Sequence, residues 1–158
     1  MYLLNYDQII KNIQSEHSNY LKIHNFKNEN MQHTSYYFRL GKNITRFDES
    51  GEQITTVLDN KNKKVIIRPN EYILVESIEI FDLSDKVKGS IGSLSEMIQM
   101  GLQLNYSPFI DPLYNGWLCV GIKNQLNKDV YLKPGDNIGK VSFYDISDTY
   151  PIKLVKGS

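Results

Sequence analysis

The stretch SPFIDPLYNGWLCVGIKN, residues 107–124, places one carboxylate, Asp111, directly before a proline and between two apolar runs. Aspartate before proline is a common turn former, and a carboxylate on a turn can also position or activate a water molecule. Tyr114 and Gly116 follow in the same segment. The residues alone therefore leave two interpretations of Asp111 open, a turn residue and a catalytic residue.

A second candidate is GSIGSLS, residues 89–95, which we interpret as a small-residue loop that opens onto a helix. Its candidate residues are Ser90, Gly92, Ser93 and Ser95. Backbone N–H groups at a helix start can bind an anion, although glycine and serine also cap helices for structural reasons. The sequence contains no GxGxxG, P-loop or GxSxG motif.

Metal and disulfide chemistry have little support in the sequence. His17, His24 and His33 lack HxxxH or HxH spacing and have no cysteine partners, so we expect ordinary polar or turn roles for them. The single cysteine, Cys119, excludes an internal disulfide and a multi-cysteine zinc site. We therefore expect no metal bound by the protein alone.

The composition indicates one domain over residues 1–158, long enough to fold around its own core. Eighteen basic and eighteen acidic residues give zero net charge, which provides no general attraction for nucleic acid or an anionic membrane. The start MYLLNYDQII lacks a basic leader, and no apolar run approaches the ~20 residues of a membrane span. We expect a cytoplasmic protein without nucleic-acid or membrane partners, whose anionic ligands need a local site.

The elements that would position these residues are mostly strands. TSYYFRL alternates Tyr36, Phe38 and Leu40 on one face, QITTVLD and KVIIRP are rich in β-branched residues, and turn residues recur at short intervals. This pattern predicts a sandwich, barrel or jelly roll, in which the basic run NKNKK is a solvated hairpin tip.

Two short helices complete the prediction. NYDQIIKNIQSEH has helical spacing, with Asn5 as a cap and Gln8 three residues on. SLSEMIQMGL places Leu94, Met97, Ile98 and Leu102 on one face, and Gly101 would end the helix.

The order of the motifs MQHTSYYFRLG, IIRPNEYILVESIEIFDL, VKGSIGSLSEMIQMGLQL, SPFIDPLYNGWLCVGIKN and VYLKPGDNIGKVSFYDI resembles the dCTP deaminase and trimeric dUTPase superfamily over nearly the whole chain. The resemblance implies a mainly β, jelly-roll-like dUTPase-type barrel or sandwich. It also implies a homotrimer with nucleotide sites at the subunit interfaces.

Several residues match the superfamily's site motifs. The resemblance implies that Asp111 would orient or activate water, that Tyr114 would pack on the deoxyribose, and that Ser93 or Ser90 would hold phosphate oxygens. The full set of implied nucleotide-binding residues is Ser90, Gly92, Ser93, Ser95, Ile110, Asp111, Tyr114, Gly116 and Lys140.

Other positions depart from the superfamily pattern. Gly121 stands where the deaminase branch has its general-acid and general-base glutamate, and no arginine in GSIGSLS matches the phosphate-binding one. Tyr37 replaces an aspartate ahead of FRLG, and Lys140 replaces a glutamine. The chain ends at YPIKLVKGS without the nucleotide-closing tail of either branch.

Three functions stay open. The first is a homotrimer that binds a nucleotide without deaminase activity and acts as a sensor, a sequestering protein or a regulator of a protein partner. The second is a dUTPase-like pyrophosphohydrolase in which Asp111 positions water and Mg²⁺ accompanies the phosphates. The third is a structural or assembly protein that uses only the trimeric fold.

Overall fold

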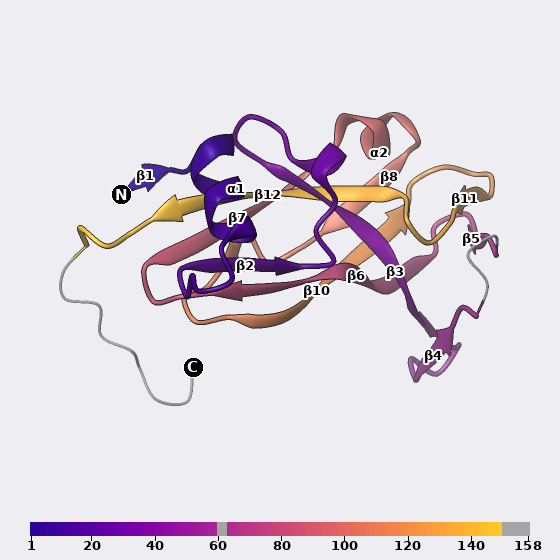
Figure 1. Cartoon of the computed structure of the whole chain (residues 1–158). Coiled ribbons are helices and arrows are strands. Elements are labelled where there is room, and N and C mark those ends of the chain that lie inside the picture. Colours follow the sequence, from indigo (N-terminus) through magenta and orange to yellow (C-terminus); the bar gives the residue numbers. More distant parts are fainter. Residues whose placement is uncertain (60–62, 150–158) are drawn as a thin grey trace.

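A long antiparallel sheet that curls on itself forms the body of the molecule (Figure 1). The structure is a computed structural model, and it describes residues 1–59 and 63–149. Its elements, in chain order, are β1 (Tyr2–Leu3), α1 (Tyr6–Gln14), β2 (Leu21–His24), the 3₁₀ turn η1 (Asn28–Asn30), β3 (Tyr36–Phe47), β4 (Gln53–Val57), β5 (Val65–Ile67), β6 (Tyr72–Leu83), β7 (Val87–Ser93), α2 (Ser95–Gln99), β8 (Leu102–Asn105), β9 (Phe109–Ile110), β10 (Asn115–Asn124), β11 (Val130–Leu132) and β12 (Asn137–Asp145).

The strand order of the main sheet is β8-β10-β6-β3-β12-β7-β9, and β3 connects its two halves. β1 adds to β12, β2 to β6 and β4 to β3, whereas β5 and β11 form a separate pair. All the strand pairs are antiparallel. The predicted mainly β, dUTPase-type architecture is confirmed.

Gly41 allows β3 to approach β6 closely where the pairing register shifts between Leu40 and Ile44. A Cβ atom at Gly41 would lie 2.8 Å from the carbonyl oxygen of Glu76. Because that oxygen belongs to the backbone and cannot rotate away, only glycine fits here without moving a strand.

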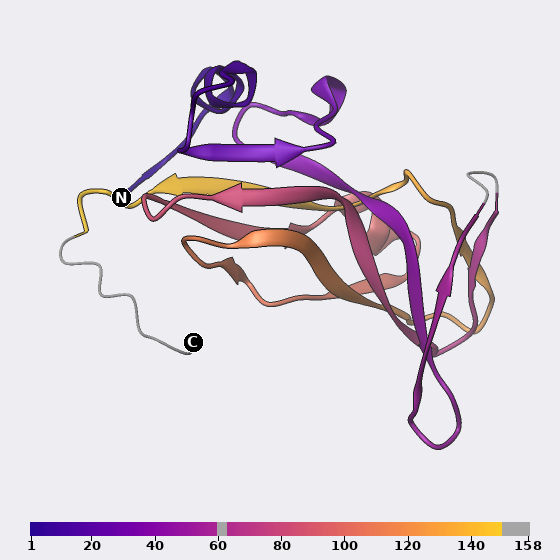
Figure 2. The same ribbon diagram turned by 60° about the horizontal axis from the view of Figure 1, so that its bottom comes forward.

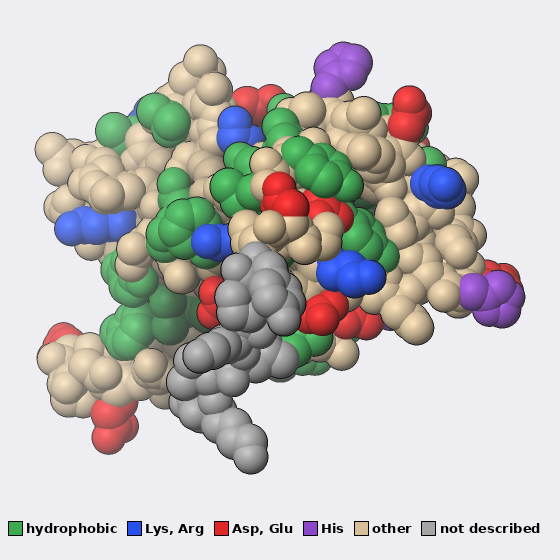
Figure 3. Space-filling view, turned by 90° about the vertical axis from the view of Figure 1, so that its left-hand side faces the viewer, with side chains coloured by type: hydrophobic (Ala, Val, Ile, Leu, Met, Phe, Trp, Pro, Cys, Tyr) green, Lys and Arg blue, Asp and Glu red, His purple; other side chains and the backbone are tan. Residues whose placement is uncertain are grey.

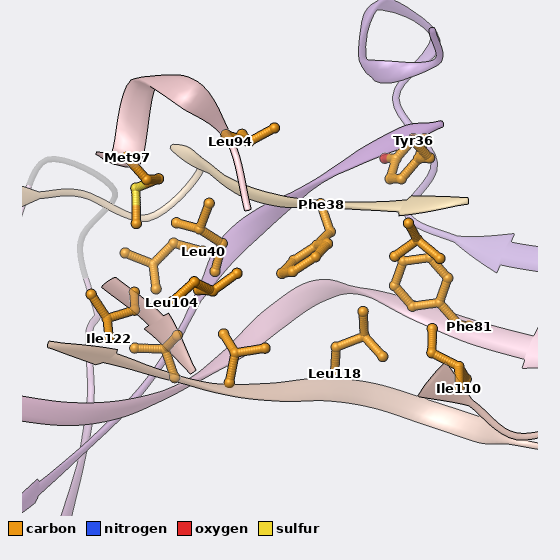
Figure 4. Close-up of a cluster of buried hydrophobic side chains, with 14 of the residues drawn as sticks. Tyr36, Phe38, Leu40, Phe81, Leu94, Met97, Leu104, Ile110, Leu118 and Ile122 are labelled. Carbon is orange, nitrogen blue, oxygen red and sulfur yellow. The ribbon is translucent and has the colours of Figure 1, made fainter. Parts of the chain in front are cut away.

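The core lies between the two halves of the curled sheet, where side chains from both halves interdigitate (Figure 4). Tyr36, Phe38 and Leu40 all point inward from β3 and are fully buried, as their period-two spacing predicts. Phe81 of β6 packs edge-on against Tyr36, with the ring centroids 6.3 Å apart.

Both predicted helices form. Asn5 and Gln8 make the reciprocal capping box at the start of α1, with Gln8 N donating to Asn5 Oδ1 at 3.0 Å. α2 ends before Gly101, whose φ of 77° is left-handed. Met97 is buried beneath α2, but Ile98 is 64% exposed, so the prediction that Ile98 faces the core is wrong. A helix of five residues presents only a narrow face to the core, which Met97 fills, and Leu94 and Leu102 are buried on either side of the helix.

The prediction of a loop over residues 89–95 is also wrong. Residues 89–93 belong to β7, where Ser90 pairs with Ser142 and Gly92 with Lys140 of β12. Glycine is required at position 89 of this strand, because a Cβ atom there would lie only 2.9 Å from Ile110 Cδ1. The tip expected at NKNKK falls partly on residues 60–62, and the C-terminal YPIKLVKGS on residues 150–158, both outside the described residues.

The β3–β4 hairpin projects from the body of the sheet (Figure 2). All five residues of β4 are exposed. The candidate site residues lie in the main sheet and beside α2, away from this projection.

Candidate functional site

A small cavity lies where α2 meets the start of β12, and we call it the Lys140 cavity. Its volume is about 140 Å³, and it is lined by Tyr37, Leu94, Ser95, Glu96, Asn137 and Lys140. Cavities that hold small molecules are commonly about 300–1,000 Å³. This volume is therefore too small to enclose a nucleotide within one chain.

The register between β7 and β12 explains how Lys140 is held. Lys140 pairs with Gly92, and a Cβ atom at Gly92 would lie 3.2 Å from Lys140 Cε. The aliphatic part of Lys140 thus runs over the bare backbone of Gly92. Ser90 lies on the same outward face, because paired residues of neighbouring strands share a face.

Asp111 lies in the turn between β9 and β10. Tyr114 N donates to Asp111 O at 3.2 Å, and Leu113 has a left-handed φ of 68°. Leu113 N donates to Ser84 O at 3.2 Å, which attaches the turn to the end of β6. Asp111 is exposed, and no described residue donates a hydrogen bond to its carboxylate. This carboxylate is free to bind a ligand or water.

Tyr114 folds back over the start of β10. Its hydroxyl donates to the carbonyl oxygen of Trp117, and a Cβ atom at Gly116 would lie 3.2 Å from that hydroxyl. Burial raises the pKa of Tyr114, and the nearby Cys119 and Glu76 raise it further. The ring is therefore neutral and is fixed against the start of β10, three residues after Asp111.

The other implied site residues have different surroundings. Ile110 is 3% exposed and packs under Gly89, so its side chain supports the turn. Ser93 lines a separate cavity of about 410 Å³ together with Ile98 and Gln103. Ser95, and not Ser90 or Ser93, is the first residue of α2.

The implied site residues fall into two groups on one chain. Ile110 pairs with Gly89, three residues before Gly92, which pairs with Lys140. Asp111 lies one residue beyond Ile110, so it is separated from the Lys140 cavity by four residues along β7, or roughly 13 Å at about 3.3 Å per residue. The turn lies toward the end of the molecule that carries the N-terminus, whereas α2 lies toward the other end (Figure 1). The chain does not bring Asp111 into the Lys140 cavity.

Gly121, where the resemblance implies a deaminase glutamate, is buried in β10. It pairs with Leu74 of β6 and with Asn105 of β8. A Cβ atom at Gly121 would lie 2.1 Å from the hydroxyl oxygen of Tyr72, which also accepts a hydrogen bond from Asn105 Nδ2 at 3.0 Å. The tyrosine ring thus occupies the space that a side chain at position 121 would need.

Sequence reasoning missed Asn137, whose side chain borders the Lys140 cavity and accepts a hydrogen bond from Asn30 Nδ2 at 2.8 Å. No pattern in the sequence indicates this role of Asn137, because the contact joins residues 107 positions apart.

Over residues 1–59 and 63–149, no group of three or more histidine, cysteine or acidic side chains is arranged to hold a metal ion. In the same part of the chain, no helix is long and apolar enough to cross a membrane.

The fold and the strand order define a protein of the dCTP deaminase and dUTPase type. The profile of the family described as dCTP deaminase-like matches residues 3–146, and the chain belongs to that family.

Curated relatives include the dUMP-forming dCTP deaminase of Salinispora arenicola, which is 28% identical over 116 residues, covering 70% of this chain and 60% of the relative. The dCTP deaminase of Pyrococcus horikoshii is 29% identical over 123 residues, covering 78% of this chain and 74% of the relative. This chain therefore spans between about three fifths and three quarters of these two enzymes.

Two solved structures share the fold. The dCTP deaminase of Agrobacterium tumefaciens superimposes with a TM-score of 0.72 at 14% identity, covering 89% of this chain and 46% of that chain. A mutant dUTPase from Staphylococcus aureus phage phi11 superimposes with a TM-score of 0.56 at 14% identity, covering 87% of this chain and 97% of that chain.

Proposed function

We propose that this protein is a homotrimer that binds a nucleotide between its subunits and does not deaminate dCTP. The observation that carries this proposal is Gly121, which provides no side chain for proton transfer, with Tyr72 filling the space beside it. Deamination needs a group that takes a proton from water and delivers it to the leaving ammonia, a role worth about 10²–10⁴ in rate. A sensor, a sequestering protein or a regulator needs only the binding site.

The separation of the two residue groups supports a site built across copies of the chain. One copy would supply Asp111 and Tyr114, and a neighbouring copy would supply the Lys140 cavity. The cavity of about 140 Å³ would gain its missing wall from that neighbour. In this arrangement the exposed Asp111 carboxylate has a role in the site beyond forming its turn.

Exposed apolar side chains within residues 109–117 support self-association through the same region. Phe109, Leu113, Tyr114 and Trp117 are between 36% and 53% exposed. The end of the molecule seen in Figure 3 presents hydrophobic side chains interspersed with acidic and basic ones. Aromatic side chains are enriched at protein interfaces relative to the rest of the surface.

A complementation experiment tests the shared site. Asp111→Asn and Lys140→Ala chains are purified separately, then mixed in equal amounts, unfolded and refolded together. If each site uses Asp111 from one copy and Lys140 from another, random assembly restores about one quarter of the sites. Calorimetric titration with dUTP and dCTP measures the number of sites, and light scattering measures the assembly.

Matched controls make the result specific. Asp129→Asn and Lys128→Ala change exposed residues outside both groups and should leave binding intact. A trimeric mixture that recovers no sites would contradict a site shared between copies. A parent chain that scatters as a monomer, or that binds neither nucleotide, would contradict the proposal as a whole.

The free carboxylate of Asp111 also supports a second candidate, a dUTPase-like pyrophosphohydrolase in which Asp111 orients water. Release of pyrophosphate from dUTP in the presence of Mg²⁺ distinguishes this candidate from a binding protein. Asp111→Asn should abolish that release, whereas the control variant Asp129→Asn should retain it.

A further inference from the structure

A larger cavity, of about 660 Å³, lies beside β3 and shares no residue with the Lys140 cavity. We call it the Arg39 cavity. Its walls include the apolar side chains of Phe26, Ile78 and Pro134 and the cationic side chains of Lys27, Arg39 and Lys42. Its volume falls within the usual range of about 300–1,000 Å³ for small-molecule sites.

Arg39 is held in a fixed position at this cavity. Its Nε donates to Glu79 Oε1 at 2.8 Å, and its Nη2 donates to the carbonyl oxygen of Asn25 at 2.5 Å. Glu79 is fully buried and also accepts from the Arg39 backbone N–H. Burial raises the pKa of Glu79, and the hydrogen bonds from Arg39 oppose that shift. No described residue accepts a hydrogen bond from Nη1, which leaves that donor for a ligand.

The side chains that line the Arg39 cavity carry surplus positive charge, and the acidic residues Glu96 and Asp136 line an adjoining cavity. No described acceptor lies within hydrogen-bond distance of the Lys27 or Lys42 amino group, and none of the described lining residues is acidic. The Glu79 carboxylate balances Arg39, and the nearby Glu76 accepts a hydrogen bond from Asn43 Nδ2 at 3.0 Å. In a chain of zero net charge, this local excess favours an anion.

The apolar wall indicates what else the anion should carry. Phe26 is stacked on Tyr36, with ring centroids 5.1 Å apart and an interplanar angle of 24°, so its ring cannot swing freely. Ile78 is half-buried and continues this surface. A ligand with a flat apolar group could lie on this wall while its charged group faces the cations.

We propose that the Arg39 cavity binds a small phosphate ester with a flat apolar group, independently of the residues assigned above to the nucleotide site. A phosphate monoester carries a charge of about −1.5 to −2 near neutral pH, which matches two unpaired lysines. Arg39 adds a guanidinium N–H donor, and proteins commonly use guanidinium groups to bind phosphate.

Phenyl phosphate is a suitable probe, with phenol and inorganic phosphate as its separate halves. Calorimetric titration should give saturable binding of phenyl phosphate and weaker binding of either half. The Lys27→Gln/Lys42→Gln variant should bind phenyl phosphate at least about tenfold more weakly, since a charge-assisted hydrogen bond contributes about that much or more. Amide resonances of Asn25 and Gly135 should shift when the probe binds.

The control variant is Lys11→Gln/Lys86→Gln, which removes two exposed lysines outside the cavity. It should bind phenyl phosphate as the parent chain does. The proposal is overturned if phenyl phosphate does not saturate the parent chain, if inorganic phosphate binds as tightly, or if the control pair weakens binding equally. Thermal unfolding of each variant verifies that all the chains compared are folded.

Discussion

Replacing Gly121 with alanine tests whether Tyr72 occupies the space beside β10. The added Cβ atom would lie 2.1 Å from Tyr72 Oη, 2.4 Å from Cζ and 2.5 Å from Cε2, so the ring must move. Moving it breaks the hydrogen bond from Asn105 to Tyr72 and disturbs the stack of Tyr72 on Phe47, whose ring centroids are 5.9 Å apart.

The magnitude follows from those two contacts. A neutral hydrogen bond contributes about 0.5–1.5 kcal/mol, and an aromatic pair contributes about as much. Alanine in a strand recovers about 0.5–1 kcal/mol relative to glycine, because it restricts the unfolded chain. We therefore expect Gly121→Ala to lower the free energy of unfolding by about 1–2 kcal/mol.

Urea unfolding of the parent, Gly121→Ala, Tyr72→Ala and the double variant measures the coupling between the two positions. In the Tyr72→Ala background the added methyl group meets no ring, so its effect should be smaller or reversed. An equal effect of Gly121→Ala in both backgrounds would refute this reasoning. The parent has no side chain at position 121 for proton transfer, and Tyr72 blocks the space that a glutamate would need, so neither the parent nor Gly121→Glu should release ammonia from dCTP at an enzymatic rate.

Two further predictions concern charged pairs. Arg39→Ala should destabilise the fold by about 3–5 kcal/mol, because it leaves the buried Glu79 without its partner, and Glu79→Gln should cost less in urea unfolding. Burial raises the pKa of Glu71, but hydrogen bonds from Arg46 and Arg68 outweigh it and hold that pKa below its ordinary value of 4.5. The unfolded chain thus binds more protons below that pH, so stability should fall as the pH drops from about 5 to about 3, and less steeply in Arg46→Gln. If stability falls as steeply with pH in Arg46→Gln as in the parent, Arg46 does not lower the pKa of Glu71.

Features fixed by neighbours in sequence were predictable. The alternation of Tyr36, Phe38 and Leu40 requires only that β3 has one buried face, and the capping box at Asn5 and Gln8 closes within four residues. Such patterns depend on local geometry, so they survive in almost any surrounding fold.

Features that depend on strand register were not predictable. Nothing near Gly121 in the sequence indicates that Tyr72, on another strand, fills its space. Residues 89–93 read as a loop because glycine and serine have low strand propensity, yet pairing with β12 outweighs that preference. The placement of Lys140 over Gly92 depends on the same pairing.

The charges around the Lys140 cavity lead to a final prediction about Mg²⁺. Tyr37 stands where the superfamily pattern has an aspartate, and Lys140 stands where it has a glutamine. The first difference removes a carboxylate and the second adds an ammonium group, so this region is more positive than the pattern. Mg²⁺ usually reaches a protein through carboxylates together with substrate phosphates. Glu96 is the one carboxylate among the described residues that line this cavity, and Lys140 already faces the space that the phosphates would enter. Nucleotide binding should therefore weaken by less than about tenfold when EDTA removes Mg²⁺, as measured by calorimetric titration. The Tyr37→Asp/Lys140→Gln variant restores both family residues and should make binding strongly dependent on Mg²⁺. If the parent chain instead loses binding in EDTA, Lys140 does not replace the metal's charge, and the phosphates must be held by a metal bound elsewhere in the assembly.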